Sequence, residues 1–364
     1  MSESTARLLS RLLLAGWLWL IAALWWPAAP GHLAGTVLFW AIGLPLVVVL
    51  LALDGTARWR RICPLAHVSL LPRALGRQRP LPAGASGPAQ APLVAPLSWL
   101  GRHHLRLQWC LLIAGLSLRL LLVNANPQAL ALLFSLTLLS ALLVGWAWDG
   151  KTWCHAFCPM GPVEAVLMGL RPVARSPGLL PESLCRTLTP EGQERSTCVH
   201  CHTPCLDIDA GRAYRHSLRQ ERGLGLAWWS YPGLVLAFFL LLAPAGASGL
   251  QGLRQASWAS PSLALTASPL TPLPWLPVLP RLLAVPLLLL LGSAVSILVF
   301  ALLRRLGLSL HRTRLLATTS AIWIFFWFSD PTLGLWNGWP FHALQLLVAV
   351  VSLRWLLWGW RREA

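Results

Sequence analysis

The sequence predicts an all-α fold, a polytopic membrane helical bundle of about eight transmembrane helices. Of its 364 residues, 56% are hydrophobic and only 11% are charged, whereas a soluble domain carries about 25% charged residues. Apolar runs of roughly 20 residues recur along the chain, and each is long enough to cross ~30 Å of hydrocarbon. This composition argues against a water-soluble enzyme and makes the lipid bilayer the first expected partner.

Eight apolar segments are expected to cross the membrane as helices, because a helix satisfies its own backbone polar groups in lipid. They cover residues 8–26, 34–53, 107–123, 128–148, 225–245, 282–303, 315–329 and 341–360.

The basic residues predict the orientation of these segments. Most of the 29 lysine and arginine residues lie in alternate gaps, and the intervening gaps hold only Arg254 and Arg281. Because positive charge is retained on the cytoplasmic side, both termini and the loops 54–104, 149–224 and 304–314 are predicted to be cytoplasmic. We therefore expect a multi-pass protein of the inner (cytoplasmic) membrane. The division of charge among short loops also argues against nucleic acid as a partner, despite the net charge of +17.

Two residue types give expectations about the membrane surface. Most of the 22 tryptophans fall near predicted span ends, where indoles anchor at lipid headgroups, and Trp228 and Trp229 are expected in this belt. Arg119 and Arg354 lie about one turn from a span end, so we expect their side chains to extend toward the surface. A buried role in ion or quinone binding is the alternative for these arginines.

Seven of the eight cysteines lie in the two long loops predicted to be cytoplasmic. Cytosolic thiols are kept reduced, so clustered cysteines there are expected to bind metal or to take part in redox chemistry. Cys110, within the third span, is expected to be a small packing residue. The candidate metal ligands are Cys63, Cys154, Cys158, Cys185, Cys198, Cys201 and Cys205.

Two of these groups are closely spaced: Cys154-His-Ala-Phe-Cys158-Pro159 and Cys198-Val-His-Cys201-His-Thr-Pro-Cys205. Two or three residues between cysteines let one short turn aim successive thiolates at a single cluster. This spacing, with proline after the last cysteine of the first group, favours iron–sulfur over zinc.

A third element, Trp59-Arg-Arg-Ile-Cys63-Pro64, follows the second span as Cys158-Pro159 follows the fourth. The match indicates a degenerate internal repeat, in which a helix pair is followed by a cytoplasmic Cys-Pro turn. The first copy has Trp59 where the second has Cys154. The matched position favours Cys63 as a metal ligand.

The segment Gly150-Lys-Thr-Trp-Cys154-His-Ala-Phe-Cys158-Pro159-Met-Gly161 resembles the Cys-x3-Cys-Pro segment of membrane polyferredoxins of the NapH, NosR and CcoG type. The resemblance covers roughly residues 34–222. It implies [4Fe–4S] clusters that are held at the cytoplasmic ends of transmembrane helices and relay electrons. The chain departs from that family at Trp59, and its cysteines at 198–205 are not the full ferredoxin run.

Two cubane clusters need eight thiolates and the loops supply seven, so one or two [4Fe–4S] clusters are expected. We expect one group at Cys63, Cys154 and Cys158 and another at Cys198, Cys201 and Cys205, with Cys185 completing either. An imidazole is a further candidate ligand, from His67, His155, His200 or His202. The basic residues beside the motifs either retain the loops in the cytoplasm and contact anionic lipid or offset the cluster's negative charge. They are Arg58, Arg60, Arg61, Lys151, Arg212 and Arg215.

These observations predict a membrane-bound iron–sulfur protein that relays single electrons between a quinol or soluble donor and a redox partner protein. It would be the electron-transfer component of an oxidoreductase system. An assembly or maturation factor for a respiratory metalloenzyme and a membrane protein with purely structural metal are the alternatives. Three regions are expected: N-terminal membrane helices with the Cys63-Pro64 loop at 1–148, a cytoplasmic ferredoxin-like iron–sulfur loop at 149–224, and C-terminal membrane helices at 225–364.

Overall fold

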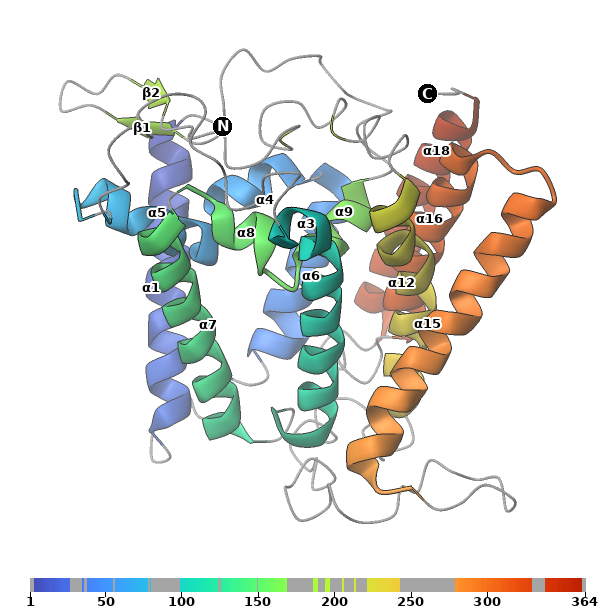
Figure 1. Ribbon diagram of the computed structural model, residues 1–364, viewed down its shortest axis with the longest axis horizontal. Helices are drawn as coiled ribbons and strands as arrows, with labels where there is room; N and C mark the ends of the chain where they lie inside the picture. Colours follow the sequence, from blue (N-terminus) through green and yellow to red (C-terminus); the bar gives the residue numbers. More distant parts are fainter. Residues whose placement is uncertain are drawn as a thin grey trace.

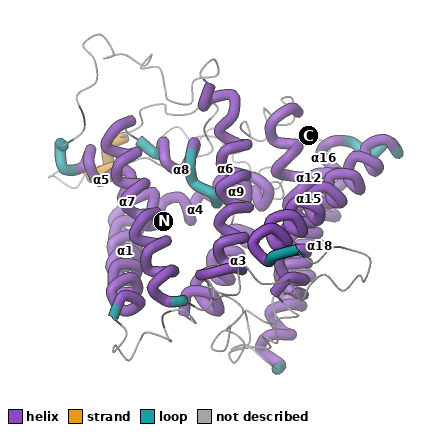
Figure 2. Tube along the Cα trace, turned by 60° about the horizontal axis from the view of Figure 1, so that its bottom comes forward, coloured by secondary structure: helices purple, strands orange, loops and turns teal. Residues whose placement is uncertain are grey.

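The computed structural model describes most of the membrane-embedded chain. The described residues are 3–26, 35, 38–54, 56–77, 79, 99–123, 126–148, 150–168, 186–188, 194–196, 205, 213, 221–242, 279–328 and 338–361. Within these ranges the chain is helical apart from one short antiparallel strand pair (Figures 1 and 2). The predicted all-α class is confirmed.

The first half of the chain alternates long and short helices. Its elements are α1 (Glu3–Trp25), the π-helix η1 (Leu38–Gly43), α3 (Leu44–Asp54), α4 (Thr56–Ile62), α5 (Pro64–Ala74), α6 (Trp99–Leu118), the π-helix η2 (Arg119–Val123), α7 (Pro127–Trp148), α8 (Thr152–Ala156) and α9 (Gly161–Met168).

The second half begins with the strand pair and continues with long helices. Its elements are β1 (Arg186–Leu188), β2 (Glu194–Ser196), α12 (Glu221–Leu242), α15 (Arg281–Arg305), α16 (Leu310–Phe328) and α18 (Trp339–Arg361).

Five helices of the described ranges are long and apolar enough to cross a membrane, so the prediction of eight such spans is confirmed only in part. The five are Ser4–Trp25, Arg102–Val123, Pro127–Trp148, Arg281–Arg305 and Trp339–Arg361. The other three predicted segments are also helical. Two of them are shorter apolar helices, Leu38–Leu51 and Leu226–Leu242, and α16 carries His311, Arg312 and Arg314 at its start, which lowers its apolar character.

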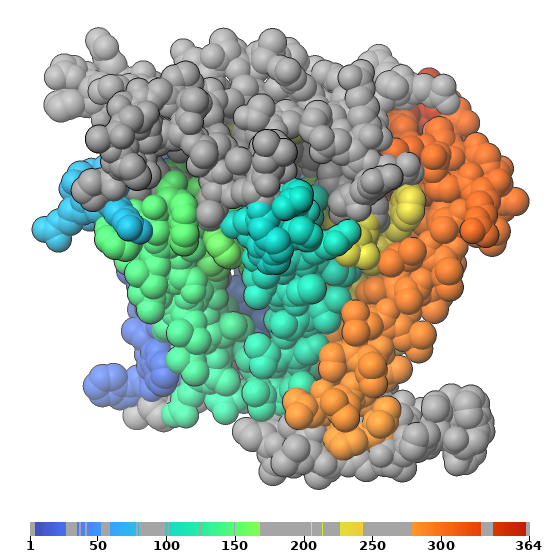
Figure 3. All heavy atoms as spheres, in the orientation of Figure 1, coloured from blue at the N-terminus to red at the C-terminus, as the bar shows by residue number. Residues whose placement is uncertain are grey.

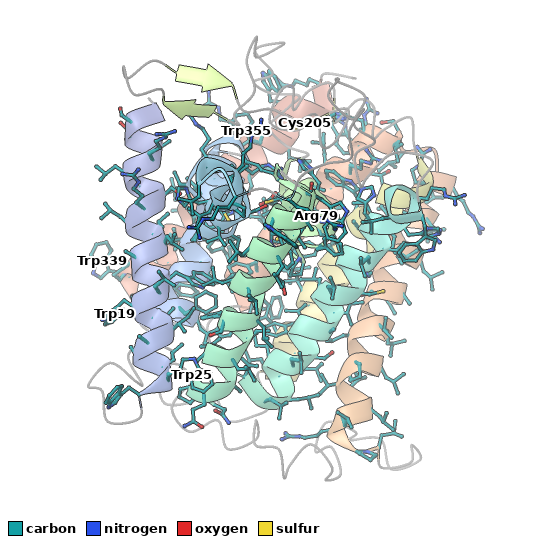
Figure 4. All side chains as sticks on the ribbon, turned by 60° about the vertical axis from the view of Figure 1, so that its left-hand side comes forward. Trp19, Trp25, Arg79, Cys205, Trp339 and Trp355 are labelled. Atoms are coloured by element: carbon teal, nitrogen blue, oxygen red, sulfur yellow. The ribbon has the colours of Figure 1, made fainter. Side chains whose placement is uncertain are left out.

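The outer surface of the long helices is apolar, as a lipid-facing surface requires. Figure 3 shows α7, α6 and α15 side by side on one face, and α15 exposes Leu287, Leu291 and Leu298 by 51%, 58% and 69%. Trp19 of α1, labelled in Figure 4, is 55% exposed on the same kind of surface. A contiguous apolar surface of this extent is typical of a protein embedded in a bilayer.

Two expectations about the membrane surface are wrong. Trp228 is fully buried, with the guanidinium carbon of Arg314 lying 5.2 Å from its ring centroid. Arg119 is only 5% exposed and does not extend outward: its guanidinium carbon lies 3.7 Å from the ring centroid of Trp40 and 4.8 Å from that of Phe238. Aromatic faces stabilise a desolvated cation, and they hold Arg119 within the bundle. Arg354 is exposed, as expected.

The short helices lie at one end of the bundle. Figure 1 places α4, α5, α8 and the strand pair at the end of the long helices where both chain termini lie. The two Cys-Pro turns, between α4 and α5 and between α8 and α9, therefore lie at this shared end.

The two halves of the predicted repeat pack reciprocally. Helix α5, which follows the first Cys-Pro turn, packs on α7, which precedes the second turn; α9, which follows the second turn, packs on α3. The α5–α7 contact is close because Gly145 lies directly against the Ser69 backbone, where a Cβ atom would clash. This exchange of partners agrees with an internal repeat.

The C-terminal helices complete the core around α9 and α12. Helix α12 packs on α15 and α16, and α16 packs on α18. Thr318 of α16 donates its hydroxyl hydrogen bond to the carbonyl of Val166 at 2.7 Å, which ties this group of helices to α9. The second Cys-Pro turn is therefore supported from both halves of the chain.

Candidate metal centre

The first Cys-Pro turn forms where α4 stops and α5 begins. Proline has no backbone N–H and a fixed φ, so it suits the first position of a helix, and Pro64 starts α5 with Cys63 just before it. The Cys63 N–H donates to the carbonyl of Trp59 at 2.8 Å, and the Cys63 carbonyl accepts from the His67 N–H at 3.1 Å. The backbone around Cys63 is thereby fixed on both sides.

The second turn carries two cysteines. Gly150 adopts φ +61°, a conformation that glycine tolerates best, and it lets the chain turn from α7 into α8. Cys154 lies in α8 and Cys158 follows it. The Cys158 N–H donates to the Trp153 carbonyl at 2.9 Å, and the Cys158 carbonyl accepts from the Gly161 N–H at 3.0 Å, at the start of α9.

The three thiols of the two turns lie close enough to influence one another's ionisation. Burial raises the pKa of Cys154 well above its ordinary value, the Arg60 charge opposes this rise, and Cys158 and Cys63 add to it. Burial likewise raises the pKa of Cys158, with Glu164 and Cys63 adding to the rise. Because such influence declines with distance, the two turns lie near each other, and the hydrogen bonds of Arg60 to Glu164 and His155 join them directly.

The backbone around both cysteines that precede proline favours the thiolate form. Burial raises the pKa of Cys63 to about 11, and the N–H groups of Ala66 and Leu65 oppose that rise. The Met160 N–H does the same for Cys158. Both turns therefore present backbone N–H groups at the start of a helix, where negative charge is stabilised.

A buried charge network lies beside the thiols. Arg60 of α4 donates to Glu164 Oε2 of α9 at 2.8 Å, and their side chains are only 4% and 9% exposed. Arg60 Nη2 lies 3.1 Å from His155 Nε2, and Lys151 Nζ donates to the Arg60 carbonyl at 3.0 Å. A guanidinium only donates, so His155 Nε2 accepts this hydrogen bond.

The network buries two of the basic residues beside the motifs. Arg60 and Lys151 are 3% and 2% exposed, so neither contacts lipid headgroups. Arg61 is half-buried. The side chain of Arg58, and residues Arg212 and Arg215, lie outside the described part of the chain.

Two positioning residues were missed by the sequence analysis. Glu164 pairs with Arg60 across 104 residues, and Gln108 of α6 donates to the Cys154 carbonyl at 3.1 Å. Gly161 leaves room for the Gln108 side chain, which a Cβ atom would meet at 2.5 Å. For Glu164, the available signal was a single carboxylate within the otherwise apolar helix α9.

Of the remaining candidate cysteines, only Cys205 lies among the described residues. Cys205 is half-buried and lies at the same end of the molecule as the strand pair (Figure 4). Among the described residues, no three His, Cys, Asp or Glu side chains are close enough to hold a single metal ion. The candidates outside the described residues are Cys185, Cys198, Cys201, His200 and His202.

His67 and Cys110 have other surroundings. Burial lowers the pKa of His67, and the charges of Arg11 and Arg7 on α1 lower it further, so this histidine is adjacent to the N-terminal helix. Cys110 is exposed on α6 instead of packed within the bundle.

Comparison of the chain with protein-family models, curated proteins and solved structures finds no match. The candidate site therefore has to be interpreted from its own chemistry.

Proposed function

We propose that this protein is a membrane-bound iron–sulfur protein that relays single electrons between a quinol or soluble donor and a redox partner protein. The observation that carries the proposal is that two Cys-Pro turns, distant in sequence, lie at one end of a membrane bundle and are joined by the hydrogen bonds of Arg60 to Glu164 and His155. These turns carry Cys63, Cys154 and Cys158.

The chemistry of the pocket fits an iron–sulfur cluster. A cubane carries an iron atom at each of four corners, so it spaces its thiolates more widely than a single ion does. No three His, Cys, Asp or Glu side chains of the described residues converge on a single ion, so the proposal requires a group that spaces its ligands this way. When bound, such a cluster accepts and releases one electron at a time.

The surrounding residues are suited to hold a negatively charged group. Buried thiols with raised pKa values release their protons when metal binds. The cations Arg60 and Lys151 offset part of the resulting negative charge, as do the N–H groups at the starts of α5 and α9. Positive charge and N–H donors near thiolate sulfur raise a cluster's reduction potential.

The position of the two Cys-Pro turns supports electron exchange with a cytoplasmic partner. Both chain ends and both Cys-Pro turns lie at one end of the long helices, and the basic loops predict that this end is cytoplasmic. The proposal therefore places the site at the inner face of the cytoplasmic membrane.

The test is metal analysis of protein purified without oxygen. We expect iron and acid-labile sulfide in the full-length protein and an EPR signal after dithionite reduction. Cys63→Ser, Cys154→Ser and Cys158→Ser should each lower the iron and sulfide content, whereas Cys110→Ser, on the exposed face of α6, should leave it unchanged. Zinc without sulfide would rule out the electron-transfer function.

A second measurement separates a relay from a maturation factor. Reduction of the clusters by a quinol analogue in proteoliposomes, followed by EPR, is expected for a respiratory relay. Clusters that resist the quinol but reduce a partner's thiols or metal would favour the maturation role.

A further inference from the structure

A buried cation–aromatic contact lies within the bundle, away from the candidate metal centre. The guanidinium carbon of Arg119, at the start of η2, lies 3.7 Å from the ring centroid of Trp40 in η1. Arg119 stands eleven residues after Gln108, which contacts the second turn, and this corresponds to about 16 Å along a helix. Figure 1 shows that α6 leads into η2 at the end of the bundle opposite the two termini. The contact is therefore separate from the two Cys-Pro turns.

Both residues of this contact lie in π-helices. Trp40 belongs to η1 (Leu38–Gly43), and Arg119 is the first residue of η2 (Arg119–Val123). π-Helices are rare, and where they interrupt α-helices they are frequently found at functional sites. The meeting point of η1 and η2 is therefore a candidate ligand site.

The polar groups at this point are hydrogen-bond donors. Trp40 and Arg119 are only 6% and 5% exposed. Among the described residues, nothing accepts a hydrogen bond from the Trp40 indole nitrogen, and the buried hydroxyl of Ser117, in the same helical turn as Arg119, has no partner there either. An indole N–H can only donate, and a buried donor without an acceptor is unfavourable. The site therefore calls for an acceptor.

The charge of the site is positive. The guanidinium of Arg119 is a cation, and the sequences of η1, α6 and η2 contain no aspartate or glutamate. An anion accepts from the indole N–H and offsets the guanidinium charge at the same time. A water molecule provides only the acceptor.

The packing around Trp40 favours a small ligand. The Arg119 guanidinium covers one face of the Trp40 ring, and Phe39 contacts that ring at a centroid distance of 4.7 Å. Phe39 packs in turn on Phe134 at 4.5 Å, so a flat organic ligand would have to separate these rings. Burial also strips water from an ion, and this cost is greater for a divalent ion than for a monovalent one.

We propose that Arg119 and Trp40 form an intramembrane site for one small monovalent anion of the halide class. The guanidinium and the indole N–H both donate to the anion, which connects η1 with η2. The site goes beyond the proposed iron–sulfur function and does not depend on it.

Thermal unfolding of the full-length protein in detergent tests the site. Chloride replaces gluconate at constant ionic strength, so that general screening stays the same. An anion that binds only the folded protein raises the Tm as its concentration rises. Bromide should act as chloride does, and sulfate should not. Equilibrium binding of radioactive chloride to the wild type should saturate at one ion per chain.

Two variants locate the binding. Trp40→Phe keeps an aromatic face for Arg119 but lacks the indole N–H, so chloride should bind about tenfold more weakly or worse. Arg119→Leu removes the charge and should abolish saturable binding. The matched control is Trp229→Phe on α12, nine residues before Phe238. The Trp229 indole nitrogen is also buried without an acceptor among the described residues, and its loss should leave chloride binding unchanged.

Three results would overturn the inference. The first is a wild-type protein that shows no saturable binding of chloride and no rise in Tm with it. The second is a Trp40→Phe variant that binds chloride as tightly as the wild type, and the third is a Trp229→Phe variant that loses binding to the same extent as Trp40→Phe. If one of the two site variants does not fold, the other variant and the wild type decide the matter.

Discussion

The side chain of Arg60 connects the two Cys-Pro turns. Arg60 lies three residues before Cys63. It binds His155 of α8 and Glu164 of α9, the helices on either side of the second turn. In the internal repeat His155 is the equivalent of Arg60 itself. Equivalent positions of the two halves therefore meet at this contact.

Breaking this buried ion pair is expected to destabilise the protein. Glu164→Gln leaves the Arg60 charge buried without its carboxylate, so it should lower the free energy of unfolding by about 3 kcal/mol. The double variant Arg60→Met with Glu164→Leu removes both charges and should recover much of that loss. Thermal unfolding in detergent measures both, with the exposed Arg354→Gln as control. Equal stability of Glu164→Gln and the control would show that the pair contributes nothing.

Single residues were predictable from sequence only where spacing carried the information. The shared position of the two Cys-Pro turns at one end of the bundle was predictable, because proline follows Cys63 and Cys158 and the two segments match. The burial of Arg119 was not predictable, since it depends on Trp40 and Phe238 from other helices. Glu164 was missed for the same reason: its partner lies 104 residues away.

At the scale of elements, the α5–α7 contact holds the first turn against the second half of the site. Ser69 of α5 also donates its hydroxyl hydrogen bond to the Gly150 carbonyl at 2.9 Å, at the turn that leads into α8. The position of α5 is thus fixed both along its length and at the site itself.

A larger residue at the α5–α7 contact should separate the two turns. Gly145→Val places its side chain against the Ser69 backbone, and we expect a loss of about 3 kcal/mol in stability from overpacking. Bound iron should fall with it. Gly115→Val on α6, where nothing lies within 4 Å of the added Cβ atom, is the matched control. A Gly145→Val protein that melts and loads iron as the control does would contradict the role of this contact.

The existence of the helices was predictable and their local irregularity was not. Every predicted span contains a helix, because apolar runs of that length have no other stable form in lipid. The second segment nevertheless includes the π-helix η1, which precedes α3. Local hydropathy does not report such irregularity, since it depends on contacts with neighbouring helices.

At the scale of the molecule, the arrangement predicts that both termini share one side of the membrane. Fluorescent protein fused to either end should fluoresce, and alkaline phosphatase at either end should be inactive, because both ends are expected in the cytoplasm. Phosphatase inserted between residues 246 and 281 should be active. Termini on opposite sides would refute the topology and with it the cytoplasmic location of the site.

The reciprocal packing of α5 on α7 and of α9 on α3 has a consequence for biogenesis. Neither Cys-Pro turn reaches its final surroundings until the ribosome has passed Met168, because each depends on a helix from the other half. In a nascent chain that ends before this point, the proposed metal site would be incomplete. Under the proposed function, loading is therefore expected after insertion of the first half of the bundle, and chains truncated before Met168 should contain no iron.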